Sequence, residues 1–140
     1  MMRDAEKTVG NMIDKLKTAF IGSIDGEGFP TIKAMLQPRK RKGIKTIYLT
    51  TNTSSMRVAQ YRKNSHACIY FCDTRFFRGV MLRGTMEVLT DPASKEMIWQ
   101  EGDIMYYPEG VTDSDYCVLK FTATSGRFYS NFKSESFIVE

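Results

Sequence analysis

The sequence lacks acidic residues over a long stretch. Between Gly28 and Cys72 there is no Asp or Glu, although this window carries nine Lys and Arg residues. Residues 84–119, by contrast, hold eight acids and one lysine, and the net charge of the whole chain is only +4. A protein that binds nucleic acid over a broad surface is more uniformly basic. The distribution therefore favours a local anion site, or a basic face that meets an acidic one across a dimer.

Histidine and cysteine are also scarce. His66 is the only histidine, and no His/Cys cluster has the spacing of metal ligands, so we expect no metal. Nucleophilic catalysis of the Ser-His-Asp or Cys-His type would have to involve His66, and nothing near it resembles a nucleophile elbow. The three cysteines lie in apolar segments and are predicted to be buried, reduced thiols. We therefore expect no catalytic side chain of these types.

Several nucleotide-binding and targeting signals are missing as well. No G-x-G-x-x-G follows a strand-like segment and no G-x-x-x-x-G-K-[ST] is present, which excludes Rossmann and P-loop sites. There is no apolar run near 18 residues and no signal-peptide core, so we expect a soluble, cytoplasmic protein that does not bind membranes. A length of 140 residues favours one domain, residues 1–140, which buries roughly two-thirds of its unfolded surface.

Apolar periodicity and turn residues predict many short strands and few helices. Strands are expected at residues 18–24, 30–37, 46–51, 67–73, 76–89, 116–124 and 127–132. Helices are expected at residues 4–17, at 56–64 and after Asp91, which caps a helix that starts with Pro92. Residues 38–43 are predicted to be a loop whose four consecutive charges form a solvated tip or part of a substrate site. This pattern of strands predicts a closed antiparallel barrel.

The segment 46–57 combines a strand, a hydroxyl-rich turn and a helix start. The turn offers the hydroxyls of Thr51, Thr53, Ser54 and Ser55 beside the unpaired N–H groups of the helix, where the dipole favours an anion. Arg57 lies in the first helical turn, where a cation is normally unfavourable by about 0.3–1 kcal/mol, and a bound phosphate would reverse that sign. Alternatively, Ser54 or Ser55 is a simple N-cap and Arg57 a solvated charge.

Three stretches, in their order and spacing, resemble the pyridoxamine 5′-phosphate oxidase-like family of FMN-binding split β-barrels, in particular its general stress protein branch. Residues 30–36 resemble the strand whose basic residue, here Lys33, and following backbone meet the flavin. Residues 51–57 are similar to the family's Thr-Asn-x-x-Ser-x-basic phosphate loop. Residues 78–87 resemble the long strand that follows. The likeness runs from about residue 18 to 89, with a looser similarity at 116–123.

The resemblance implies a mainly β, antiparallel FMN-binding split barrel of six to seven strands and two to three helices. It also implies a homodimer with the flavin at the subunit interface. Ser55 and Arg57, with Thr51, would hold the FMN phosphate. Lys33 would lie near the ring system or ribityl chain, and Ala34 and Met35 would present backbone to the isoalloxazine edge. Tyr129 and Phe132 are candidates to flank the flavin of the other subunit. Thr50 would contact the flavin edge or be only a strand residue. The expected cofactor-binding residues are Lys33, Ala34, Met35, Thr50, Thr51, Ser54, Ser55, Arg57, Tyr129 and Phe132.

Two departures from the family's oxidases bear on the substrate. The chain has Gly79 where they carry Gln, and it lacks the C-terminal Arg-x-x-Arg segment that they use for pyridoxal phosphate. We therefore do not expect a vitamin B6 substrate. The sequence favours an FMN-dependent oxidoreductase acting on an unidentified small molecule, with a non-enzymatic flavin carrier or stress/redox sensor as the alternative. Binding of nucleic acid through the acid-free window is a third, weaker hypothesis, which predicts a steep salt dependence.

Overall fold

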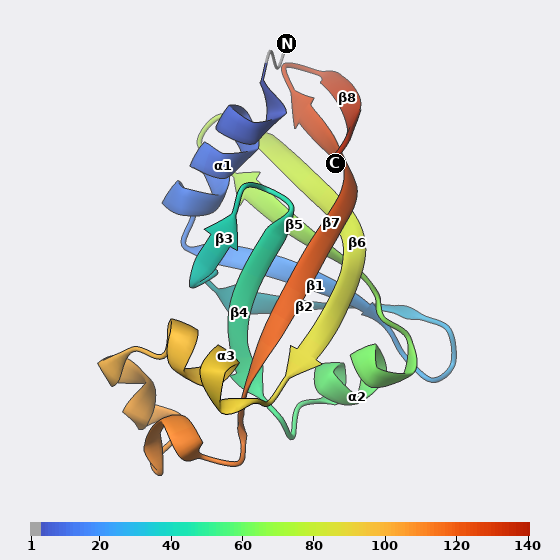
Figure 1. The fold of residues 1–140 in the computed structure, drawn as a ribbon. Coiled ribbons are helices and arrows are strands. Elements are labelled where there is room, and N and C mark those ends of the chain that lie inside the picture. Colours follow the sequence, from blue (N-terminus) through green and yellow to red (C-terminus); the bar gives the residue numbers. More distant parts are fainter. Residues whose placement is uncertain (1–3) are drawn as a thin grey trace.

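Eight antiparallel strands form the framework of the chain in a computed structural model that describes residues 4–140 (Figure 1). The strands are β1 (Thr18–Ile24), β2 (Pro30–Leu36), β3 (Lys40–Lys42), β4 (Thr46–Asn52), β5 (His66–Asp73), β6 (Arg78–Leu89), β7 (Tyr116–Ser130) and β8 (Lys133–Ile138). The helices are α1 (Ala5–Lys15), α2 (Met56–Lys63), α3 (Pro92–Ile98) and two 3-10 helices, η1 (Glu101–Met105) and η2 (Gly110–Thr112). No helix of the described residues is both long and apolar enough to cross a membrane.

The path of paired strands runs from β2 at one end to β3 at the other. Neighbouring strands follow the order β2-β1-β5-β6-β7-β4-β3, and β8 is an additional partner of β7. One side of β7 pairs with β6, while its other side pairs first with β4 and then with β8. A register shift between Arg83 and Gly84 leaves Thr124 as an extra residue of β7. Such a bulge increases the local twist, which lets β7 leave β4 and continue to β8.

The helices begin where the sequence provides caps. Asp4, Ser55 and Asp91 each accept an N–H bond from the first turn of the helix that follows. Figure 1 shows α1 and β8 at one end of the barrel and α2 at the other, joined to β4 by the loop that follows that strand. The caps at Ser55 and Asp91 and the Pro92 start of α3 confirm what the sequence predicts for these helices.

Two apolar clusters hold these elements together. The larger one fills the barrel with Ile21, Ile69, Phe71, Leu82 and Phe121, and α1 and Tyr61 of α2 pack against it. The smaller one joins Tyr48, Ile98, Tyr107, Tyr116 and Val118, with the half-buried Trp99 against it. It lies between the sheet and residues 91–115, so this helical segment covers the outer side of β4 and β7.

The mainly β, antiparallel class and the three α-helices expected from the sequence are confirmed, but the strands differ in detail. Residues 116–130 form one strand, because the bulge at Thr124 absorbs the break predicted between two strands. Residues 40–42 form β3 instead of lying wholly in a loop. Charged side chains are acceptable there because β3 is an edge strand whose backbone alone pairs with β4.

Candidate functional site

The hydroxyl-rich turn joins the end of β4 to the start of α2. Ser55 has an extended backbone and its Oγ accepts the N–H of Val58 at 3.3 Å, so Ser55 is the N-cap of α2. The first turn of α2 contains no acidic residue. A capping hydroxyl still has a proton and a second lone pair, so capping and anion binding are compatible at Ser55. The Ser54 side chain is exposed beside it.

Arg57 is half-buried in the first turn of α2 and forms no ion pair within the described part of the chain. Its charge lies near Tyr61, one turn along α2. Burial raises the pKa of the Tyr61 hydroxyl, and the positive charge of Arg57 opposes that rise. Tyr61 donates to the carbonyl of Gly22 at 2.9 Å, which fixes α2 against β1. Arg57 is therefore held at the sheet without a carboxylate to neutralise it.

A polar cluster that the sequence analysis missed ties α2 to the first two strands. Gln60 Oε1 accepts from the Ser23 hydroxyl at 2.5 Å and from the Thr31 hydroxyl at 3.2 Å. Lys33 shares the β2 face of Thr31, one same-face step or about 7 Å further on. Arg57 precedes Gln60 by one helical turn, about 5–6 Å. The Gln60–Thr31 hydrogen bond thus joins the helix that carries Arg57 to the strand that carries Lys33.

Asp115 is a second residue that the sequence analysis missed. Its carboxylate accepts the Ser54 N–H at 2.8 Å and an Asn52 side-chain N–H at 3.3 Å. Its backbone carbonyl accepts the Thr53 N–H at 2.7 Å. The Thr53 hydroxyl is buried, so it does not join the exposed hydroxyls of the turn as predicted. Only the spatial pairing of β4 with β7 brings Asp115 to this loop, and no local sequence signal announces it.

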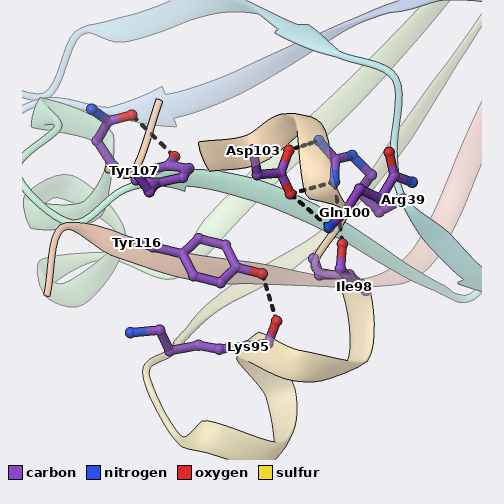
Figure 2. Close-up of polar contacts among 8 residues, drawn as sticks. Arg39, Lys95, Ile98, Gln100, Asp103, Tyr107 and Tyr116 are labelled. Atoms are coloured by element: carbon purple, nitrogen blue, oxygen red, sulfur yellow. Dashed lines mark hydrogen bonds and ion pairs between the residues drawn. The ribbon is translucent and has the colours of Figure 1, made fainter. Parts of the chain in front are cut away.

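A polar network links residues 91–115 to Arg39, Asn52 and Tyr116 (Figure 2). The guanidinium of Arg39 donates to both carboxylate oxygens of Asp103, at 2.8 and 2.6 Å, and to the carbonyl of Ile98 at 3.2 Å. This pairing holds the pKa of Asp103 below its usual value. Tyr116 donates to the carbonyl of Lys95 at 2.7 Å, and Tyr107 donates to Asn52 Oδ1 at 3.3 Å.

The consecutive charges of residues 39–42 are therefore partly structural. Arg39 is paired with Asp103, and Arg41 donates to both oxygens of Asp14 at 2.8 Å. Lys40 and Lys42 remain exposed. A substrate role for the whole basic run is less favoured by this geometry than internal pairing of its two arginines.

The strand residues of the predicted site lie on different faces. Thr51 is buried and shares a face of β4 with Leu49 of the barrel core. Thr50 shares the other face with Tyr48, which the 91–115 segment covers. Ala34 is exposed on β2, whereas Met35 packs against the barrel core. Tyr61 of α2 belongs to the same barrel core as Leu49, so α2 packs on the side of the sheet that Thr51 faces and not on the side of Thr50.

Tyr129 and Phe132 lie far from the turn in the same chain. β7 begins opposite Asn52 and carries Tyr129 at its other end, roughly 40 Å of strand away. Figure 1 shows the two ends of β7 at opposite ends of the barrel. Phe132 is 94% exposed, and Tyr129 makes an edge contact with Phe77 at 6.2 Å. One chain does not bring these aromatic residues to Arg57.

Close packing against Tyr70 explains why position 79 is a glycine in this chain. The Tyr70 hydroxyl and ring occupy the space that a Cβ at position 79 would fill, and the carbonyl of Phe71 is 3.3 Å from it. A Gln at this position would require Tyr70 to move. Tyr70 is 38% exposed on the outer face of β5, and burial raises the pKa of its hydroxyl.

Comparison with known proteins gives the same fold. The family model described as "Pyridoxamine 5'-phosphate oxidase like" matches residues 4–139. A Clostridium acetobutylicum protein, related to general stress protein 26 of Bacillus subtilis and placed in the pyridoxinephosphate oxidase family, is 39% identical. That similarity covers 99% of this chain and 97% of the other, with a TM-score of 0.90.

More distant structures share the fold alone. General stress protein 26 from Bacillus anthracis is 12% identical, with 96% and 98% of the two chains covered and a TM-score of 0.78. A pyridoxamine 5′-phosphate oxidase-related, FMN-binding protein from Nostoc punctiforme is 11% identical, with 99% and 98% covered and a TM-score of 0.74. The comparison with curated proteins gave no match. The family match over nearly the whole chain, together with the 39% identical structure, shows that this chain belongs to the pyridoxamine 5′-phosphate oxidase-like family.

Proposed function

We propose that the chain binds FMN, with the phosphate at the start of α2, and supports flavin-dependent redox chemistry on a small molecule. The observation that carries this proposal is Arg57. It is a half-buried cation in the first turn of α2, without an ion pair in the described part of the chain. A dianionic phosphate would supply the missing counter-charge and would also interact favourably with the helix dipole.

The donor set of the turn suits a phosphate. Ser54 and Ser55 offer hydroxyl donors, Arg57 offers a guanidinium, and charge-assisted bonds of this kind are the strong ones. Gln60 of α2 is hydrogen-bonded to Thr31 of β2, and we place the rest of the ligand along β2, where Lys33 is exposed. Ala34 would present its backbone at the same exposed strand. Family membership and the FMN-binding relative from Nostoc punctiforme support the assignment of the ligand.

When bound, the flavin would supply hydride or electron transfer. The residues of the chain would bind and orient it. Lys33 would place a positive charge beside the ring system or ribityl chain, which favours a ligand that gains negative charge. Among the described residues, Asp115 is the carboxylate that contacts the turn, and it accepts from Ser54 and Asn52.

We further propose a homodimer in which the second subunit completes the flavin site. Tyr129 and Phe132 would then approach the flavin of the partner, because one chain keeps them far from Arg57. Apolar side chains on the outer face of β2 support an interface there, since Ile32 is 78% exposed and Leu36 is 58% exposed. Such exposed apolar groups in a continuous strand are typical of surfaces that a partner covers.

A non-enzymatic flavin carrier or redox sensor is the second candidate. Similarity to a protein related to general stress protein 26 supports it. Steady-state oxidation of NADH or NADPH, with purified protein, FMN and a quinone or oxygen as acceptor, separates the two. Turnover above the rate of free FMN supports an oxidoreductase. FMN binding without such turnover supports a carrier or sensor.

The test of FMN binding is a comparison with riboflavin, which lacks only the phosphate. Both ligands are titrated at constant ionic strength while flavin fluorescence is followed. We expect FMN to bind at least about ten-fold more tightly, since one charge-assisted phosphate contact contributes about 1.5–3 kcal/mol. Equal dissociation constants for the two ligands would refute the phosphate assignment.

A further inference from the structure

Asp115 contacts three consecutive residues of the hydroxyl-rich turn between β4 and α2. Its Oδ2 accepts from the Asn52 side chain at 3.3 Å, its backbone carbonyl accepts from Thr53 N at 2.7 Å, and its Oδ1 accepts from Ser54 N at 2.8 Å. Ser54 directly precedes Ser55, the cap of α2. The path of the turn into α2 is therefore fixed by a residue that lies about sixty positions later in the chain.

Asp115 is itself anchored to a buried polar unit. Its N–H donates to Asp113 Oδ1 at 2.9 Å, and Asp113 Oδ2 accepts the N–H of Glu109 at 3.1 Å. The ammonium of Lys95 donates to the Asp113 carbonyl at 2.9 Å. Asp113 is 7% exposed and Lys95 is 8% exposed, so this unit belongs to the interior of the 91–115 segment. A tightly held carboxylate of this kind can order the turn before any ligand binds.

The role of Asp115 differs from that of an anion-binding residue. A carboxylate beside a phosphate repels it, so direct binding cannot explain its position. Its acceptor oxygens do something else: they hold the Ser54 amide and the Asn52 side chain in one arrangement. An ordered turn binds its ligand more tightly because the conformational entropy of the turn is already lost.

We propose that Asp115 is the positioning residue of the phosphate site, which acts by ordering the turn that presents Ser55 and Arg57. This inference rests on the proposed binding of FMN. It assigns a function to the 91–115 segment, which otherwise only covers the outer side of β4 and β7. It also implies that the negative charge of Asp115 is a cost at this site and that its oxygen acceptors are the useful feature.

Two substitutions separate the acceptor from the charge. Asp115→Ala removes both, and we expect FMN affinity to fall about ten-fold while riboflavin affinity changes less than about three-fold. Asp115→Asn keeps an oxygen acceptor for Ser54 N and removes the repulsion. The Asn52 amide can reverse to accept from the new side-chain amide, and the Tyr107 hydroxyl then accepts from Asn52 Nδ2 instead of donating to Oδ1. We expect this variant to bind FMN as tightly as the wild type or a few-fold more tightly.

Asp91→Ala is the matched control. It removes the cap of α3, where Asp91 accepts from Ser94 N at 3.0 Å, and so weakens the same segment without touching the turn. We expect its ratio of FMN to riboflavin affinity to equal that of the wild type. Unchanged FMN affinity in Asp115→Ala, an equal loss in Asp115→Asn, or an equal loss in Asp91→Ala would each overturn the positioning role.

A measurement on the wild type covers the case in which Asp115→Ala does not fold. Hydrogen exchange at the Ser54 amide should be slow in the absence of FMN, because this N–H already donates a hydrogen bond to the Asp115 carboxylate. Fast exchange that slows only when FMN binds would overturn the proposal. A wild type that binds FMN and riboflavin equally would instead reject the phosphate site itself, so the two failures are distinguishable.

Discussion

Replacement of Arg57 by alanine tests the central feature of the proposed site. The guanidinium is half-buried and forms no ion pair in the described part of the chain, so its removal breaks no ion pair within that part. The loss of one charge-assisted contact to phosphate is about 1.5–3 kcal/mol. We therefore expect Arg57→Ala to weaken FMN binding by roughly ten- to 150-fold.

The effect on stability should have the opposite sign. A cation in the first turn of a helix is unfavourable by about 0.3–1 kcal/mol, so the ligand-free Arg57→Ala variant should be as stable as the wild type or slightly more stable. Arg62→Ala is the control, since it makes the same charge change in the last turn of the same helix. There the cation is favourable, so this control should lose about 0.3–1 kcal/mol of stability and keep its FMN affinity.

The assay is a fluorescence titration with FMN and riboflavin for each variant, together with urea unfolding of the ligand-free proteins. The reasoning predicts that the loss in Arg57→Ala is confined to FMN. If riboflavin affinity falls by the same factor, Arg57 does not act on the phosphate. If the ligand-free Arg57→Ala variant unfolds, Arg57 is a structural residue and the proposed site loses its main support.

Four further predictions concern the rest of the structure. Removal of the Arg39 side chain should cost about 3 kcal/mol in chemical denaturation, because it leaves the Asp103 carboxylate, 4% exposed, without its partner. The pKa of Asp103 lies below its usual 3.8, so the pair stabilises the fold above pH 3.8, and that contribution is lost as the pH falls through the lower folded-state pKa; an acid titration of Asp103→Asn should show a weaker dependence there. Gly79→Gln should destabilise the fold by about 1–3 kcal/mol in thermal unfolding, and a second change of Tyr70→Ala should recover part of the loss, whereas an unchanged melting temperature in Gly79→Gln would contradict the described packing. FMN should hold a dimer together in sedimentation at concentrations where the ligand-free protein dissociates, and a monomer that binds FMN equally well would remove Tyr129 from the site.

Much of the fold follows from local chemistry that can be read along the chain. Ser55 and Asp91 cap α2 and α3 because their side chains accept N–H bonds from the next helical turn, an interaction within three residues. The alternating strands around the turn, and the absence of acids near Arg57, are equally local. These signals predict an anion site at a helix start, with Arg57 as its cation.

The sequence could not show how the turn is held or what lies beside it. Asp115 reaches Ser54 only because β4 pairs with β7 across more than sixty residues. Gln60 reaches Thr31 only because α2 packs on β1, the strand that pairs with β2. Arg39 reads as part of a solvated basic run until Asp103 closes on it from the 91–115 segment. Periodicity and capping act within a few residues, whereas register and docking depend on the whole packed sheet. The sequence itself therefore determined the Ser55 cap and the position of Arg57 in the first turn of α2. The tertiary structure decided that Asp115 contacts the turn and that Tyr129 lies far from it.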